Sequence, residues 1–183
     1  MHKNICSYTD RSKVTNADLH TDWAIDLWNR EVSDHDHLFH LGDFCFAKGY
    51  ETLKGIVTRL KGKKHFILGN HDSESNFARL HREGLIEWYG HYKEIKIDDQ
   101  KVVLFHFPIL SWHRQHYGSW HLSGHMHGSL LPENNRGKML DVGLDNAYNL
   151  YGEHKFFSEQ MLVDYMQDKE VYIADGHTNR TGE

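Results

Sequence analysis

Four short apolar runs in this chain end at Asp, Asn or His, residue types that can bind metal ions or protons. Short apolar runs that end at glycine or polar turns are typical of buried strands. In an open α/β sheet the carboxyl ends of the strands lie at one edge, so residues far apart in sequence can meet there. The four groups are Gly42-Asp43, Gly69-Asn70-His71-Asp72, His106-Phe107-Pro108 and Gly124-His125-Met126-His127-Gly128.

Each group also has an ordinary structural explanation. Gly42-Asp43 is a turn, residues 70–72 are a helix cap, and residues 125–127 are a surface turn. His106 is then a hydrogen-bonded core histidine. Singly, these explanations are favoured, but four such groups in order, each at the end of a strand, make coincidence a poor account. Together they predict one shared site.

The composition favours metal chemistry and excludes other classes. The 183 residues, 39% of them hydrophobic and 26% charged, suit a globular domain. No apolar run is long enough to cross a bilayer, and the amino-terminal residues do not resemble a signal peptide, so a cytoplasmic location without membrane contact is expected. The net charge of −5 argues against a broad nucleic-acid surface, whereas 17 histidines favour metal binding.

The hydrophobic pattern predicts alternating strands and helices. Early strands that alternate with helices, followed by hairpin strands, indicate a mixed α/β sandwich. We expect one domain over residues 1–174 and a polar tail over 175–183. The expected helices cover residues 15–32, 50–60, a segment that starts at 73, and 158–166; the expected strands cover residues 37–41, 64–68, a hairpin from 95 to 105, 120–123 and 138–142.

The ordered set of motifs resembles the signature of calcineurin-like metallophosphoesterases over about residues 1–149. The resemblance implies an α/β fold with a sandwich of two mixed β-sheets flanked by helices, in four layers. It also implies a hydrolase with two divalent metal ions, such as Mn, Fe or Zn, that cleaves a phosphomonoester or phosphodiester by attack of a metal-bridging hydroxide. The expected substrate is small and phosphorylated. Nucleic acid stays open, because Trp112, Tyr117 and Trp120 flank the motifs.

The resemblance assigns metal ligands residue by residue. Asp43 resembles the carboxylate that bridges both cations. Asn70, His106 and His125 resemble the other ligands of one cation, and His127 resembles a ligand of the second. This donor set suits divalent transition metals, because imidazole and amide oxygen bind a cation without adding negative charge.

The resemblance also assigns two catalytic residues. His71 resembles the histidine that stabilises or protonates the leaving oxygen of the substrate. The neighbouring carboxylate of Asp72 would orient that imidazole.

The family pattern begins with a strand that ends in Asp-x-His, and the printed sequence has no match to it. Residues 1–5 resemble only the segment that follows this motif. The second cation would keep only Asp43 and His127, so the chain is expected to hold one cation tightly. Asp18-Leu19-His20 is rejected as a substitute because its spacing places it in a helix. His2, on the same loop as the missing motif, is not assigned as a ligand.

Two explanations of the missing motif are open, a longer product with an internal Met1 and a genuine short form, and the longer product is favoured. The leading function is a phosphoesterase. The alternative is a degenerate module that holds one metal ion and binds or senses a phosphorylated ligand without turnover. The loops over residues 111–119 and 130–136 would set specificity, and neither identifies a substrate.

Overall fold

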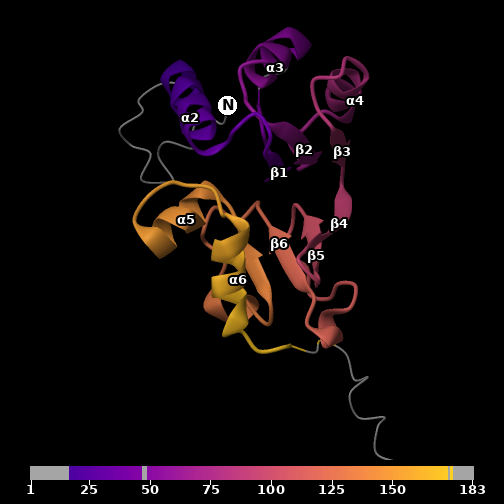
Figure 1. The fold of residues 1–183 in the computed structure, drawn as a ribbon, viewed down its shortest axis with the longest axis vertical. Helices are drawn as coiled ribbons and strands as arrows, with labels where there is room; N and C mark the ends of the chain where they lie inside the picture. The colour runs from indigo at the N-terminus through magenta and orange to yellow at the C-terminus, as the bar shows by residue number, and fades with distance from the viewer. Residues whose placement is uncertain (1–16, 47–48, 173, 175–183) are drawn as a thin grey trace, which may run out of the picture.

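A computed structural model of the protein describes residues 17–46, 49–172 and 174 (Figure 1). The helices are α2 (Ala17–Glu31), α3 (Tyr50–Val57), α4 (Glu74–Arg82), α5 (Leu144–Tyr151) and α6 (Glu159–Gln167), with short 3-10 turns at Gln115–Tyr117 and Pro132–Asn134. The strands are β1 (His37–Leu41), β2 (Lys63–Ile67), β3 (Trp88–Gly90), β4 (Tyr92–Ile97), β5 (Gln100–Phe105), β6 (Trp120–Ser123) and β7 (Met139–Asp141).

The strands form two sheets, which confirms the α/β class. The first has the order β1-β2-β3 and is parallel throughout its described strands, because α3 and α4 carry the chain back between successive strands. The second has the order β4-β5-β6-β7 and is mixed, since β4 and β5 form an antiparallel hairpin while β6 and β7 add in parallel. The expectation of two mixed sheets is therefore correct for the second sheet and wrong for the described part of the first.

Two hydrophobic cores hold these layers together. One lies between the three-stranded sheet and the helices α2, α3 and α4, and includes Trp28, Val57 and Phe66. The other joins the two sheets to α6 and includes Leu41, Leu104 and Leu162. Within the described ranges, no helix is both long and apolar enough to cross a bilayer.

Most predicted elements are confirmed, with differences of a few residues at their ends. The helix expected at 15–32 is α2, although Leu19, which was placed on its buried stripe, is 53% exposed. Helix α5 was not predicted from the sequence; Leu144–Tyr151 is a short helix of 8 residues. Residues 1–16 and the tail 175–183 lie outside the described residues.

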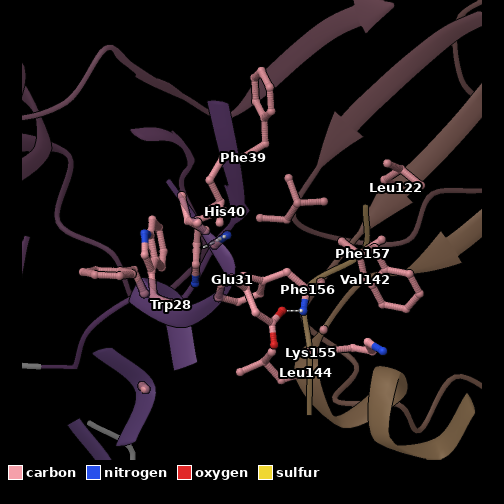
Figure 2. A pocket seen from close by; sticks show the side chains of 18 of the residues that line it. Trp28, Glu31, Phe39, His40, Leu122, Val142, Leu144, Lys155, Phe156 and Phe157 are labelled. Carbon is pink, nitrogen blue, oxygen red and sulfur yellow. Dashed lines mark hydrogen bonds between the residues drawn. The ribbon is translucent and has the colours of Figure 1, made fainter. Parts of the chain in front are cut away.

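A large open cavity lies along one edge of β1. All five residues of β1 line it and none of β2 does, so it borders the edge of β1 that faces away from β2. Figure 2 shows Phe39 and His40 of β1 on one side, with Leu122, Val142 and Phe157 across the space. Its volume of about 1540 Å³ is roughly ten times that of the ~150 Å³ engineered cavity that stays dry in a protein core. The edge of β1 thus faces space rather than another strand in the described part of the molecule.

The burial of α2 yields a first prediction. Trp28 is 3% exposed, its Nε1 donates a hydrogen bond to the Lys61 carbonyl at 2.9 Å, and its ring packs on Phe156 at 5.6 Å. We expect Trp28→Ala to reduce the free energy of unfolding by about 3–5 kcal/mol in urea denaturation. Leu19→Ala on the same helix is the matched control and should change it by less than about 0.5 kcal/mol. Equal losses for both variants would contradict this assignment of the buried face.

Candidate metal centre

Four predicted metal ligands meet where their strands end. Asp43 follows β1, Asn70 follows β2, His106 follows β5 and His125 follows β6. Nε2 of His106 lies 3.2 Å from Oδ1 of Asn70, 3.2 Å from Nδ1 of His125 and 3.5 Å from Oδ2 of Asp43. Ligand atoms of Asp43, His106 and His125 all lie within 4.8 Å of one another. The two sheets therefore bring one compact donor set together.

Glycines make this close approach possible. A Cβ atom on Gly42 would lie 2.2 Å from Nδ1 of His106, and Gly42 also has a φ of +100°. A Cβ atom on Gly69 would lie 2.2 Å from Oδ1 of Asp43. Both glycines precede a predicted ligand, so the Gly-Asp and Gly-Asn pairs of the sequence reflect steric need where the loops meet.

The donor atoms around His106 suit a cation. Its Nδ1 lies 2.7 Å from the carbonyl oxygen of Leu41, which can only accept, so Nδ1 carries the proton. In a neutral ring, Nε2 then presents a lone pair toward the oxygens of Asn70 and Asp43 and toward His125. Burial lowers the pKa of His106, but the contacts with Asp43 and Leu41 raise it more, and the net shift is upward. A positive charge among these atoms is thus favoured, from a proton or from a metal ion.

Asp43 is held in an unusual backbone conformation by Asp72. Asp43 has a φ of 56°, in the left-handed region that non-glycine residues rarely adopt. The carboxylate of Asp72 accepts hydrogen bonds from the backbone N–H groups of Gly69 at 2.9 Å, Asp43 at 2.8 Å and Phe44 at 3.0 Å. Burial raises the pKa of Asp72, and these three N–H groups oppose the shift without cancelling it. Asp72 therefore ties the β1 and β2 loops together.

This geometry corrects one expectation about the catalytic pair. Asp72 was expected to orient the imidazole of His71, but its oxygens bind backbone N–H groups instead. The backbone N–H of His71 donates to Oδ1 of Asp43 at 3.0 Å, and the ring of His71 packs on Phe46 at 4.5 Å. The imidazole of His71 is exposed beside the donor cluster.

His127 lies on the same loop as His125 but outside the compact cluster of ligand atoms. Its Nδ1 is 3.1 Å from Oδ2 of Asp145, and the N–H of the next residue, Gly128, donates to Oδ2 of Asp141 at 2.9 Å. The sequence reasoning did not select Asp141 or Asp145. The signal was present, since the strand expected at 138–142 ends at Asp141-Val142-Gly143, much as the other strands end at their motifs.

The other residues weighed in the sequence lie apart from this cluster or outside the described ranges. Residues 18–20 lie in α2, where His20 is buried, which confirms that they belong to a helix. His2 falls among the undescribed residues. Trp112 and Trp120 are buried in the core, whereas Tyr117 is 71% exposed.

One solved structure resembles this fold over nearly its whole length. The crystal structure of AQ665, a protein of unknown function from Aquifex aeolicus, matches with a TM-score of 0.64 and 18% sequence identity, over 90% of this chain and 92% of that chain. Such low identity shows a shared fold and nothing about activity. No family model and no curated protein matches the chain.

The packing of Gly69 yields a prediction about the site. Gly69→Ala should displace Asp43, because the added methyl group meets its backbone N and Oδ1, and overpacking of this kind costs about 1–3 kcal/mol. We expect lower stability in urea and weaker Mn²⁺ binding by calorimetry. Gly55→Ala is the control, because Gly55 is exposed in α3 with no atom within 4 Å, and the change should stabilise the helix by about 0.5–1 kcal/mol. Unchanged metal binding in Gly69→Ala would contradict the role given to this close approach.

A buried histidine below the site loop yields a pH prediction. His121 is fully buried, with Nδ1 3.3 Å from the Val103 carbonyl and Nε2 3.2 Å from the Phe107 carbonyl, and burial lowers its pKa to about 4. Between about pH 6.5 and pH 4 the unfolded chain therefore binds a proton that the folded protein excludes.

The free energy of unfolding should consequently decrease as the pH is lowered through this window, by up to about 1.4 kcal/mol per pH unit from His121. Urea denaturation at about pH 7 and about pH 5 measures the loss. His121→Gln removes the titrating group and should make the dependence shallower. An equally steep dependence in both proteins would show that His121 is not excluded from protonation.

Proposed function

We propose that this protein is a metal-dependent phosphoesterase, a hydrolase of the calcineurin-like metallophosphoesterase kind that acts on a small phosphorylated substrate. The main support is the convergence of donor atoms on Nε2 of His106, which favours a positive charge between Asp43, Asn70 and His125. The buried His106 forms the floor, and the exposed side chains of Asn70 and His125 leave the cluster open to solvent. A substrate can therefore reach the same atoms that would hold the metal.

Asp43, Asn70, His106 and His125 would hold one divalent cation, with Mn, Fe or Zn suited to this mixture of oxygen and imidazole donors. Asp43 and His127 would contribute to a second. Bound there, such cations stabilise charge on the phosphoryl oxygens and make a water molecule more acidic. His71 is exposed beside Asp43 and can give a proton to the leaving oxygen of the ester.

We extend the proposal to the fold. An additional strand along the open edge of β1 would complete the four-layer sandwich of this family and bring an Asp-x-His pair to the second cation. Among the described strands only β2 pairs with β1, and this arrangement and the cavity of about 1540 Å³ beside β1 support the extension. A strand there would have Trp28 and Ile25 of α2 on one side and Leu122 of β6 on the other, so it would be apolar on both faces.

A second candidate is a module that holds one cation and binds a phosphorylated ligand without hydrolysis. The observation in its favour is that Asp43, His106 and His125 form the one group of three such side chains with adjacent ligand atoms in the described ranges. His127 contacts Asp145 instead.

Metal stoichiometry and turnover separate the two candidates. We would measure Mn²⁺ binding by calorimetry and hydrolysis of p-nitrophenyl phosphate and bis-p-nitrophenyl phosphate. The proteins are this chain and a version extended by an apolar strand that ends in Asp-x-His, and His125→Ala is the inactive control for each. We expect the extended protein to bind about two metal ions and to hydrolyse at least one ester, as two-metal catalysis requires.

Binding of one metal ion with no turnover by either protein would favour the phospho-ligand module. No metal binding by either protein would overturn both candidates. Turnover by this chain with two bound ions would show that the added strand is unnecessary.

A further inference from the structure

The loop that carries His125 and His127 is held by the β7–α5 segment. His125, His127 and Gly128 have φ values of 64°, 49° and 71°, a left-handed series that the chain does not adopt without support. Asp141 accepts a hydrogen bond from the N–H of Gly128 at 2.9 Å, and Nδ2 of Asn149 donates to the carbonyl of Gly128 at 3.1 Å. Both the backbone N–H and the backbone carbonyl of Gly128 are therefore hydrogen-bonded to side chains of the β7–α5 segment.

The ring of His127 is fixed by a different residue. Oδ2 of Asp145 lies 3.1 Å from Nδ1 of His127, and Asp145 is 6% exposed in the first turn of α5. An ionised carboxylate can only accept, so Nδ1 of His127 carries the proton and the neutral ring keeps its lone pair on Nε2.

His106 shows the same arrangement with a different acceptor. Its Nδ1 faces the Leu41 carbonyl, and its Nε2 faces the donor cluster. Histidines that bind metals usually donate their second N–H to a carboxylate or a carbonyl, which sets the tautomer and the ring orientation. Asp145 therefore places an acceptor oxygen at Nδ1 of His127, as the Leu41 carbonyl does at Nδ1 of His106.

We propose that Asp145 is a positioning residue that fixes His127 in its Nδ1–H tautomer and so presents Nε2 of His127 as a metal ligand. The second half of this statement rests on the proposed function. His154 lies near the other oxygen of this carboxylate, with Nε2 3.8 Å from Oδ1 of Asp145 and its ring stacked on Tyr148 at 4.9 Å.

The tautomer can be read without any metal. Two-bond ¹H–¹⁵N correlation spectra of the metal-free protein, with His127 assigned through His127→Gln, distinguish the two neutral forms. We expect the Nδ1–H form in the unaltered chain. In Asp145→Asn the amide can donate as well as accept, and a change of this kind favours the wrong histidine tautomer in catalytic triads. The His127 signals should therefore move toward the Nε2–H form in that variant.

Metal affinity gives the second readout. It is measured on the version extended by a strand that ends in Asp-x-His. Asp145→Asn should weaken the second Mn²⁺ site by about 10–100-fold, as other losses of such hydrogen bonds do, and should leave the first site unchanged. Asp26→Asn is the control, because Asp26 is exposed on α2 and this change removes the same negative charge; it should alter neither readout. Asp145→Glu keeps the carboxylate and should retain more of the Nδ1–H population of His127 than Asp145→Asn does.

An Nε2–H tautomer of His127 in the unaltered chain would overturn the proposal, as would a tautomer that Asp145→Asn leaves unchanged in a folded variant. If the tautomer shifts as expected but Mn²⁺ binding does not change, Asp145 sets the ring and His127 is not a ligand. That result would count against the two-metal function and not against the Asp145–His127 contact.

Discussion

The carboxylate of Asp72 connects the two loops on which the rest of the centre depends. It accepts hydrogen bonds from the backbone N–H groups of Gly69, Asp43 and Phe44. These bonds hold the ends of β1 and β2 together and keep Asp43 in a left-handed conformation. A strained backbone conformation of this kind persists only where its surroundings determine it fully. The position of the Asp43 carboxylate, and with it the whole donor cluster, follows from a side chain that does not itself join the cluster.

The loop that carries His125 and His127 is supported by the same physical means. Asp141 accepts a hydrogen bond from the N–H of Gly128, and Asp145 contacts the ring of His127. Carboxylates of β7 and α5 therefore hold both the loop backbone and the His127 side chain. Burial raises the pKa of Asp141, and backbone N–H groups of Gly128 and Gly143 oppose that shift. Asp72 and Asp141 thus both accept hydrogen bonds from backbone N–H groups, whereas the carboxylate of Asp43 faces Nε2 of His106.

The cavity beside β1 sets the other constraint on this molecule. An edge strand normally meets solvent with polar or charged side chains, or is covered by another element. Here Phe39 of β1 lies across an open space from Leu122 of the second sheet, and both residues line that space (Figure 2). The site residues Asp43 and His127 also line this space, so whatever fills it would lie next to the centre.

The sequence by itself determined the elements and the donor types. Short apolar runs placed β1, β2, β5 and β6 to within a residue or two, because a buried strand must be apolar and a glycine must stand where two backbones nearly touch, as at Gly42 and Gly69. Only the tertiary structure decided the support of the centre. Whether Asp72 binds His71 or the backbone of Asp43, and whether Asp145 reaches His127, depends on how strands distant in sequence are stacked, since each contact joins separate loops. Local pattern carries no information about such distances.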